Sequence, residues 1–139
     1  MISKKATYGL KAVISLAKRQ EQGPVLITDL AKEERLPKKF LEAILLELRK
    51  AGILDSKKGK GGGYVLAKGP QEITVGEIIE VLDGPLGQVN LKGKTKEESE
   101  IELILKEVRD AMSNILNRAT VADVIERARS GQNIFNYVI

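Results

Sequence analysis

The stretch Ser56–Ala67 of this 139-residue chain reads SKKGKGGGYVLA and places cationic side chains beside an unusually free backbone. Lys57, Lys58 and Lys60 lead into Gly61–Gly63, and an aromatic residue and a short apolar segment follow. Ammonium groups attract phosphates, and glycines let a backbone approach a ligand closely. The combination is typical of the wing of a winged helix-turn-helix, which contacts DNA phosphates and the minor groove.

The glycines could instead form a nucleotide-binding cradle. Such a loop requires a Gly-Lys-Ser/Thr sequence that opens a helix. Here Gly61–Gly63 lead into Tyr64, Val65 and Leu66, which favour a strand. This context argues against a nucleotide site.

Cysteine and histidine are both absent from the chain. Their absence excludes thiol nucleophiles, disulfides, Cys/His zinc sites, cysteine-ligated iron–sulfur clusters and histidine general bases. Sites for magnesium or calcium built only from carboxylates remain open, although no acidic spacing resembles a calcium loop. We therefore expect a protein that is not an enzyme and that needs no cofactor.

Charge is distributed unevenly along the sequence. The whole chain carries +4, but residues 1–70 hold 15 Lys/Arg against 7 Asp/Glu, whereas residues 71–139 hold 8 against 12. A basic half joined to an acidic half indicates a polyanion-binding module attached to a different unit. Uneven solvated charge is the alternative explanation.

The composition favours an aliphatic, helical core. Hydrophobic residues make up 42% of the chain, but aromatics only 4%. No apolar run approaches a membrane span, and the short apolar stretch Ala12–Ala17 is flanked by basic residues in a way that does not fit a secretion signal. The expected location is the cytosol.

Two helices are expected near the start of the chain. The first lies near Thr7–Gln20, and Gly23 with the following proline ends it. After a short extended entry, Thr28 is placed to cap a second helix, Asp29–Glu34.

A third helix is expected after a brief turn, with Pro37 at its first position and Gly52 at its end. Its apolar face comprises Phe40, Leu41, Ile44, Leu45 and Leu48, and its other side carries Lys38, Lys39, Glu42 and Ala43. A short helix, a tight turn and a longer helix form a helix-turn-helix, although any two packed helices can show this pattern. Strand-like runs at 52–57 and 64–67 add a hairpin. The predicted fold class is therefore mainly α with a small β-hairpin wing.

The second half of the chain indicates an oligomerisation unit. A helix at Val75–Leu82, capped by Thr74, precedes a loop at 85–96 and a long helix from Glu97 to Arg118. The long helix carries an apolar stripe, which packs either on its own domain or, as we expect, on a second copy. The stripe consists of Ile101, Ile104, Leu105, Val108, Met112 and Ile115. The expected organisation is a DNA-binding domain at 1–84 with its wing at 52–67, the loop, and a dimerisation helix with a tail at 97–139.

The end of the chain is apolar. Thr120 is placed to cap a last helix, Val121–Ala128, which Gly131 ends. The residues Tyr137, Val138 and Ile139 either fold back onto the dimer core or form a docking tail whose terminal carboxylate a partner protein captures.

Taken together, these segments resemble the Rrf-two family of bacterial winged-helix regulators. The resemblance spans nearly the whole chain, and its most specific part is GILDSKKGKGGGYVLA; SKKATYGLKAVISLA, EITVGEIIEVLDGPLG and ATVADVIE also match. It implies a winged-helix head and a long helix that crosses its counterpart in a homodimer.

Many members of this family hold a [2Fe–2S] cluster with three cysteines in the loop before the long helix, and this chain has none there. The resemblance therefore implies the cluster-free branch, which includes CymR-like repressors of cysteine and sulfur metabolism. In that branch the signal is relayed through cysteine synthase, an enzyme that accepts isoleucine-ended tails, so Ile139 is the implied anchor.

The expected function is that of a cytoplasmic homodimeric repressor on an imperfect palindrome of double-stranded DNA. Lys58 stands where relatives often carry arginine, Ala43 replaces a frequent glutamine, and Glu42 can accept from cytosine. A protein-interaction adaptor and a redox regulator with carboxylate ligands are the alternatives. The expected DNA-binding residues are Lys4, Lys5, Thr7, Tyr8, Thr28, Pro37, Lys38, Lys39, Phe40, Glu42, Ala43, Lys57, Lys58, Lys60, Gly61 and Gly62.

Overall fold

The computed structural model describes residues 2–59, 61–86 and 95–138, with side chains up to residue 131. In chain order they form α1 (Lys4–Lys18), the 3-10 helix η1 (Gln20–Gln22), α2 (Ile27–Glu34), α3 (Lys38–Lys50), β1 (Leu54–Lys57), β2 (Gly63–Leu66), α4 (Val75–Asp83), α5 (Lys96–Arg118) and α6 (Val121–Val138).

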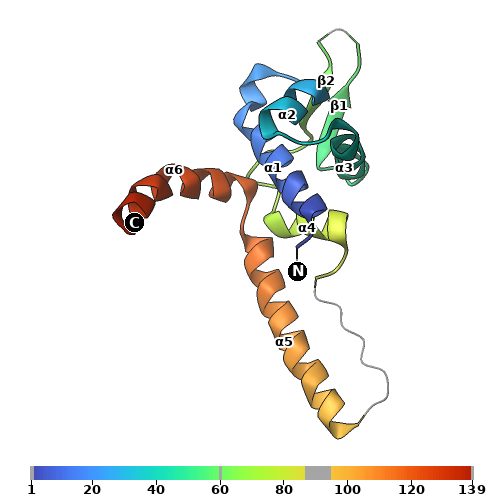
Figure 1. Cartoon of the computed structure of the whole chain (residues 1–139), viewed down its shortest axis with the longest axis vertical. Coiled ribbons are helices and arrows are strands. Elements are labelled where there is room, and N and C mark those ends of the chain that lie inside the picture. Colours follow the sequence, from blue (N-terminus) through green and yellow to red (C-terminus); the bar gives the residue numbers. More distant parts are fainter. Residues whose placement is uncertain (1, 60, 87–94, 139) are drawn as a thin grey trace.

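The elements form a head and two projecting helices (Figure 1). Helices α1 to α3 and the β1–β2 hairpin make up the head, with α4 beneath them. Helix α5 runs away from the head as a long arm, and α6 leaves the junction in another direction. This is the predicted mainly helical architecture with a two-stranded wing.

The core is aliphatic, as the composition predicts. Helix α3 contributes four side chains with no exposed area, and α4 contributes Ile78 and Ile79. The core also crosses the expected boundary between the two units, because Val121 at the start of α6 is 1% exposed and its amide donates to the Ile73 carbonyl at 2.8 Å. The head and the start of α6 therefore share one core.

The beginnings of the helices correct part of the prediction. Thr28 does not cap α2: the helix begins at Ile27, with Leu26 at the N-cap position and no side-chain cap. The Leu30 amide already donates to the Leu26 carbonyl at 3.0 Å, so the helix starts directly after Val25, which pairs with Tyr64 in a β-bridge. Pro37 is the N-cap of α3 rather than its first helical residue. The Thr74 cap of α4 is confirmed, since its hydroxyl accepts from the Glu77 amide at 3.0 Å.

The turn between α2 and α3 uses a residue in the left-handed region. Arg35 has φ 55° and ψ 48° and ends α2. The Leu36 amide then donates to the Ala31 carbonyl at 2.9 Å, and the Leu36 side chain is buried. The brief turn expected at these two residues is confirmed, and it sets the angle between the two helices.

The wing is an antiparallel hairpin in which Leu54 faces Leu66 and Lys57 faces Gly63. The segment before α2 adds to its edge: the Val25 amide donates to the Tyr64 carbonyl at 3.0 Å, and the Tyr64 amide donates back to the Val25 carbonyl at 2.8 Å. Gly63 sits at this crossing with φ +148°, where an added Cβ would lie 2.3 Å from the Val25 carbonyl oxygen. Only glycine fits there.

Helix α5 begins with a complete capping box. The Thr95 hydroxyl accepts from the Glu98 amide at 3.1 Å, and the Glu98 carboxylate accepts from the Thr95 amide at 3.3 Å. These bonds satisfy two of the free amides of the first turn.

Of the residues described, no helix is both long enough and apolar enough to cross a bilayer.

Helix α6 is longer than the sequence predicts. Gly131 does not end it, because the helix continues to Val138. Glycine lowers helix propensity without blocking the hydrogen bonds of the backbone, so it can remain inside a helix. The predicted Thr120 cap is confirmed: its hydroxyl accepts from the Asp123 amide, and the Asp123 carboxylate accepts from the Thr120 amide, each at 3.0 Å. Hydrogen bonding of the Asp123 carboxylate to the Thr120 amide, and to a smaller extent to the Thr120 side chain, lowers the pKa of Asp123.

Candidate nucleic-acid interface

Helix α3 is divided into a buried side and an open side. The packing side holds Leu41, Ile44, Leu45 and Leu48, each with no exposed area. The open side presents Lys38, Lys39, Glu42 and Ala43, all exposed, in the first two turns of the helix. This end of the helix is therefore free to meet a ligand, with two cations and one hydrogen-bond acceptor.

Phe40 does not belong to the buried side, although the sequence placed it on the apolar face. Its side chain is 38% exposed, and its ring lies edge-on to that of Tyr8, with centroids 5.5 Å apart and an interplanar angle of 86°. Edge-to-face contacts of this kind are favourable between aromatic rings. The contact connects the second turn of α1 to the first turn of α3.

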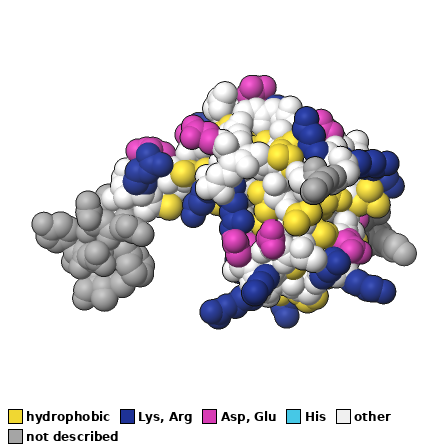
Figure 2. Space-filling model, turned by 90° about the horizontal axis from the view of Figure 1, so that it is seen from above, with side chains coloured by type: hydrophobic (Ala, Val, Ile, Leu, Met, Phe, Trp, Pro, Cys, Tyr) yellow, Lys and Arg dark blue, Asp and Glu magenta, His cyan; other side chains and the backbone are white. Residues whose placement is uncertain are grey.

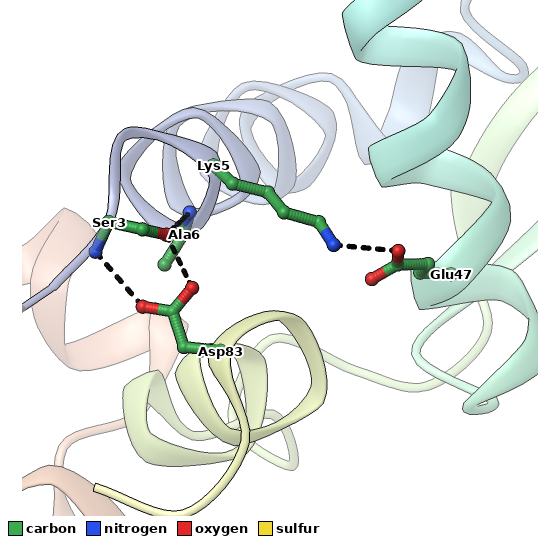
Figure 3. Close-up of polar contacts among 5 residues, drawn as sticks. All are labelled: Ser3, Lys5, Ala6, Glu47 and Asp83. Atoms are coloured by element: carbon green, nitrogen blue, oxygen red, sulfur yellow. Dashed lines mark hydrogen bonds and ion pairs between the residues drawn. The ribbon is translucent and has the colours of Figure 1, made fainter. Parts of the chain in front are cut away.

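The start of α1 is held by polar contacts to two other helices (Figure 3). The Ser3 amide donates to the Asp83 carboxylate at 2.9 Å, and the Ser3 hydroxyl donates to the same group while accepting from the Ala6 amide. On the other side, the Lys5 ammonium donates to Glu47 of α3 at 2.7 Å. Lys5 therefore has a protein partner, while Lys4 and Thr7 beside it are exposed.

The wing presents its lysines to solvent. Lys57 and Lys58 are exposed, and Lys60 lies outside the described residues. The turn is closed by the Gly62 amide, which donates to the Gly59 carbonyl at 2.9 Å. An added Cβ at Gly62 would lie 2.3 Å from the Lys57 carbonyl oxygen, so glycine is required for this tight turn.

Two contacts at this face were not predicted from the sequence. The Arg49 guanidinium donates to the Ser56 hydroxyl at 3.2 Å and so joins the end of α3 to the first strand of the wing. Glu47 forms the ion pair with Lys5 described above. No local sequence pattern could have shown either pair, because each depends on how α3 packs against another element.

Seen from above, the head carries Lys and Arg side chains at several of its edges, with apolar side chains between them (Figure 2). The exposed cations include Lys38 and Lys39 on α3 and Lys57 and Lys58 on the wing. Thr28, in the first turn of α2, is also exposed. A surface with cations on two neighbouring elements is suited to a polyanion.

The predicted apolar stripe of α5 is largely open. Ile101, Ile104, Val108 and Ile115 are between 48% and 60% exposed, whereas Leu105 and Met112 are half-buried. Leu103 is 55% exposed as well, although the stripe did not include it. Of the side chains in α5 that the structure describes, none is fully buried. Within the part of the chain that the structure describes, one face of this helix therefore has no packing partner.

The side chains of the predicted docking tail, Tyr137, Val138 and Ile139, lie outside the described part of the structure. Ile139 lies outside the described residues, and of Tyr137 and Val138 only the helical backbone at the end of α6 is described. The role of these three residues stays a prediction.

Comparison with known proteins connects this geometry to a family. Residues 2–127 match the Rrf2 family model, described as an iron-dependent transcriptional regulator. The transcriptional regulator CymR of Bacillus subtilis is 36% identical over 138 residues, which are 99% of each chain.

Solved structures agree with the sequence match. The structure of CymR, the global cysteine regulator of B. subtilis, has a TM-score of 0.77 and 37% identity, and the match covers 89% of this chain and 95% of that one. The structure of IscR from T. potens has a TM-score of 0.78 and 32% identity, and the match covers 95% and 90%. The predicted winged-helix fold is confirmed, and this chain belongs to the Rrf2 family of transcriptional regulators.

Proposed function

We propose that the chain is a DNA-binding repressor that acts as a homodimer on an operator with two inverted half-sites. The observation that carries this proposal is the open side of α3, where Lys38, Lys39 and Glu42 are exposed beside the two exposed lysines of the wing. An α-helix fits the major groove of B-DNA, and a hairpin beside it can follow the phosphates to the minor groove.

Each part of the surface has a different task in this proposal. The wing lysines and Lys4 neutralise phosphates and supply affinity that does not depend on sequence. Glu42 and Ala43 face base edges, where a carboxylate accepts from the exocyclic amine of cytosine and a methyl group suits the thymine methyl. Lys5 positions α3 through Glu47 and contacts a phosphate only from within that ion pair.

The open face of α5 supports the proposed homodimer. Four large aliphatic side chains on one face of this helix are about half exposed or more, and a second copy of the same face would remove them from water. A two-fold dimer places two recognition helices at a fixed separation, which a palindromic operator matches.

Iron does not enter the proposed mechanism, although the family description names it. The whole chain lacks cysteine and histidine. Among the residues described, no three acidic side chains gather as metal ligands. The side chains present do not fit an iron–sulfur cluster, so the signal must enter by another route.

The proposal also includes the regulated process: the repressor would control genes of cysteine and sulfur metabolism and receive its signal from that metabolism. Its support is the similarity to CymR, which is described as a global cysteine regulator. In this proposal cysteine synthase is the partner, and the terminal residue Ile139 is its anchor. Loss of the enzyme's effect on DNA binding after deletion of Ile139 would support the anchor. An unchanged effect would remove it.

Fluorescence anisotropy with labelled operator DNA tests the wing directly. We expect Lys58→Ala to weaken binding to all sequences and to lower the slope of log K against log salt by about 1, because one phosphate contact is lost. Lys96→Ala is the matched control, since Lys96 is exposed at the far end of α5.

An unchanged affinity and salt slope in Lys58→Ala would remove the wing assignment. If the wild-type chain bound no DNA at any salt concentration, the adaptor function would replace the repressor.

A further inference from the structure

A cleft lies between α4 and α5, and the proposed DNA contacts do not use it. Its volume is about 300 Å³, at the small end of the range for ligand sites. Its walls come from α4 and the residues just after it on one side and from α5 on the other. The cleft therefore lies where the head meets the arm.

The walls of the cleft carry both signs of charge. Glu80 of α4 and Asp110 of α5 supply carboxylates, and Arg109 supplies a guanidinium. The Ser113 hydroxyl and the Asn117 amide add neutral hydrogen-bonding groups. Asp110 already accepts from Lys106 at 2.8 Å, which leaves its second oxygen for another donor. Arg109 also interacts within the chain, but a guanidinium has five N–H donors and can serve a ligand as well.

This set of groups selects the kind of ligand. A simple anion would meet two carboxylates, and a simple cation would meet the guanidinium of Arg109. A molecule with an ammonium group and a carboxylate can satisfy both, with its ammonium near Glu80 and Asp110. Pro85 and Leu86 line the same cleft and can receive a small apolar side chain.

We propose that this cleft binds a small zwitterion, a free amino acid, and that the bound molecule regulates DNA binding; the regulatory part rests on the proposed function. The cleft and the dimer face occupy different sides of α5. With about 3.6 residues per turn, the cleft residues Arg109, Ser113 and Asn117 form a row along α5 that lies about a quarter of a turn or more from the exposed aliphatic side chains of the apolar face. A second copy can therefore cover the apolar face without filling the cleft.

The position of the cleft explains how binding would be transmitted. Helix α4 is fixed to the head by Ile78 and Ile79, which have no exposed area, and α5 carries the dimer face. Close packing brings the two helices together at Gly76, where an added Cβ would lie 2.2 Å from the Asn117 side-chain oxygen. A ligand that touches both helices favours one placement of the head relative to the arm. It therefore changes the spacing of the two recognition helices in a dimer.

Calorimetric titration of the full chain tests the site. Each of the protein-forming L-amino acids is titrated in turn, together with its amide, which lacks the carboxylate, and its N-acetyl derivative, which lacks the ammonium. We expect at least one free amino acid to bind, and both derivatives of it to bind at least tenfold more weakly.

Two variants separate the site from a surface effect. Glu80→Gln removes one carboxylate, and Ser113→Phe fills the cleft without changing its charge; each should weaken binding at least tenfold. Asn114→Phe is the control, because its side chain is exposed on α5 outside the cleft. Melting curves of all three show whether the fold is kept.

The inference is overturned if no free amino acid binds, if the amide or N-acetyl form binds equally well, or if Ser113→Phe binds like the wild type. DNA binding by the same samples, measured with and without the amino acids, separates this result from the proposed function. If DNA binding is found in either condition, only the cleft assignment fails; if DNA binding is absent in both conditions, the repressor function fails independently of the cleft.

Discussion

We expect the substitution Gly63→Ala to destabilise the wing, because of the backbone conformation at this position and the close approach of Val25. Gly63 has φ +148°, and its Cβ would lie 2.3 Å from the carbonyl oxygen of Val25. That oxygen accepts the Tyr64 amide at 2.8 Å, one of the two hydrogen bonds that tie the wing to the segment before α2. The substitution therefore strains the backbone and also separates two paired segments.

The expected cost combines both effects. A side chain in such a sparsely populated region costs about 1–3 kcal/mol. Each hydrogen bond lost from the bridge adds about 0.5–1.5 kcal/mol. With both bonds of the bridge lost, we expect the free energy of unfolding to fall by about 2–6 kcal/mol, a large part of the stability of a small domain.

Gly61→Ala, in the turn of the same hairpin, is the matched control. Gly61 has φ +80°, but nothing lies within 4 Å of an added Cβ, so only the left-handed conformation is penalised, by about 1–2 kcal/mol. Urea denaturation followed by circular dichroism measures both variants. Equal losses of unfolding free energy in the two variants would show that the contact between Gly63 and Val25 does not hold the wing in place.

Three further outcomes are expected. Glu42→Ala should change which sequences are bound in a competition assay while it leaves the salt slope unchanged, since a carboxylate facing bases does not neutralise phosphate; a uniform change across sequences would contradict this. In sedimentation velocity, Ile104→Glu should raise the fraction of monomer, because it places a charge on the apolar face of α5. Leu103→Glu, outside this face, should raise the monomer fraction far less, and an equal increase in both variants would contradict the assignment of the dimer face. The hydrogen bonds from Thr120 lower the pKa of Asp123 from its ordinary value of 3.8, so the cap stabilises the fold above that pH and loses its effect as the pH falls through the lower folded value. The difference in Tm between wild type and Asp123→Asn should therefore narrow in acid, and a constant difference would exclude this role of the cap.

Local sequence patterns predicted what depends on neighbouring residues. The buried side of α3, the Thr74 and Thr120 caps and the length of α5 follow from apolar spacing and capping chemistry, which act within a few residues. The glycines of the wing were also informative, because each tight turn excludes a side chain at a particular position.

Features that depend on distant contacts could not be predicted in this way. Thr28 was predicted to cap α2, but the extended segment ends at Val25, whose bridge to Tyr64 joins residues far apart in the chain, and the helix begins at Ile27. Lys5 appeared free to bind phosphate because its partner Glu47 lies on another helix. Gly131 appeared to end α6, but glycine only weakens a helix.

Selection of bound fragments from a genomic library by the purified full chain shows whether α3 and the wing bind DNA as a dimer. We predict enrichment of one motif with two inverted half-sites, and retention of these fragments should fall steeply as salt is raised. Fragments without a shared motif, or retention that does not respond to salt, would contradict the claim that α3 and the wing read DNA as a dimer.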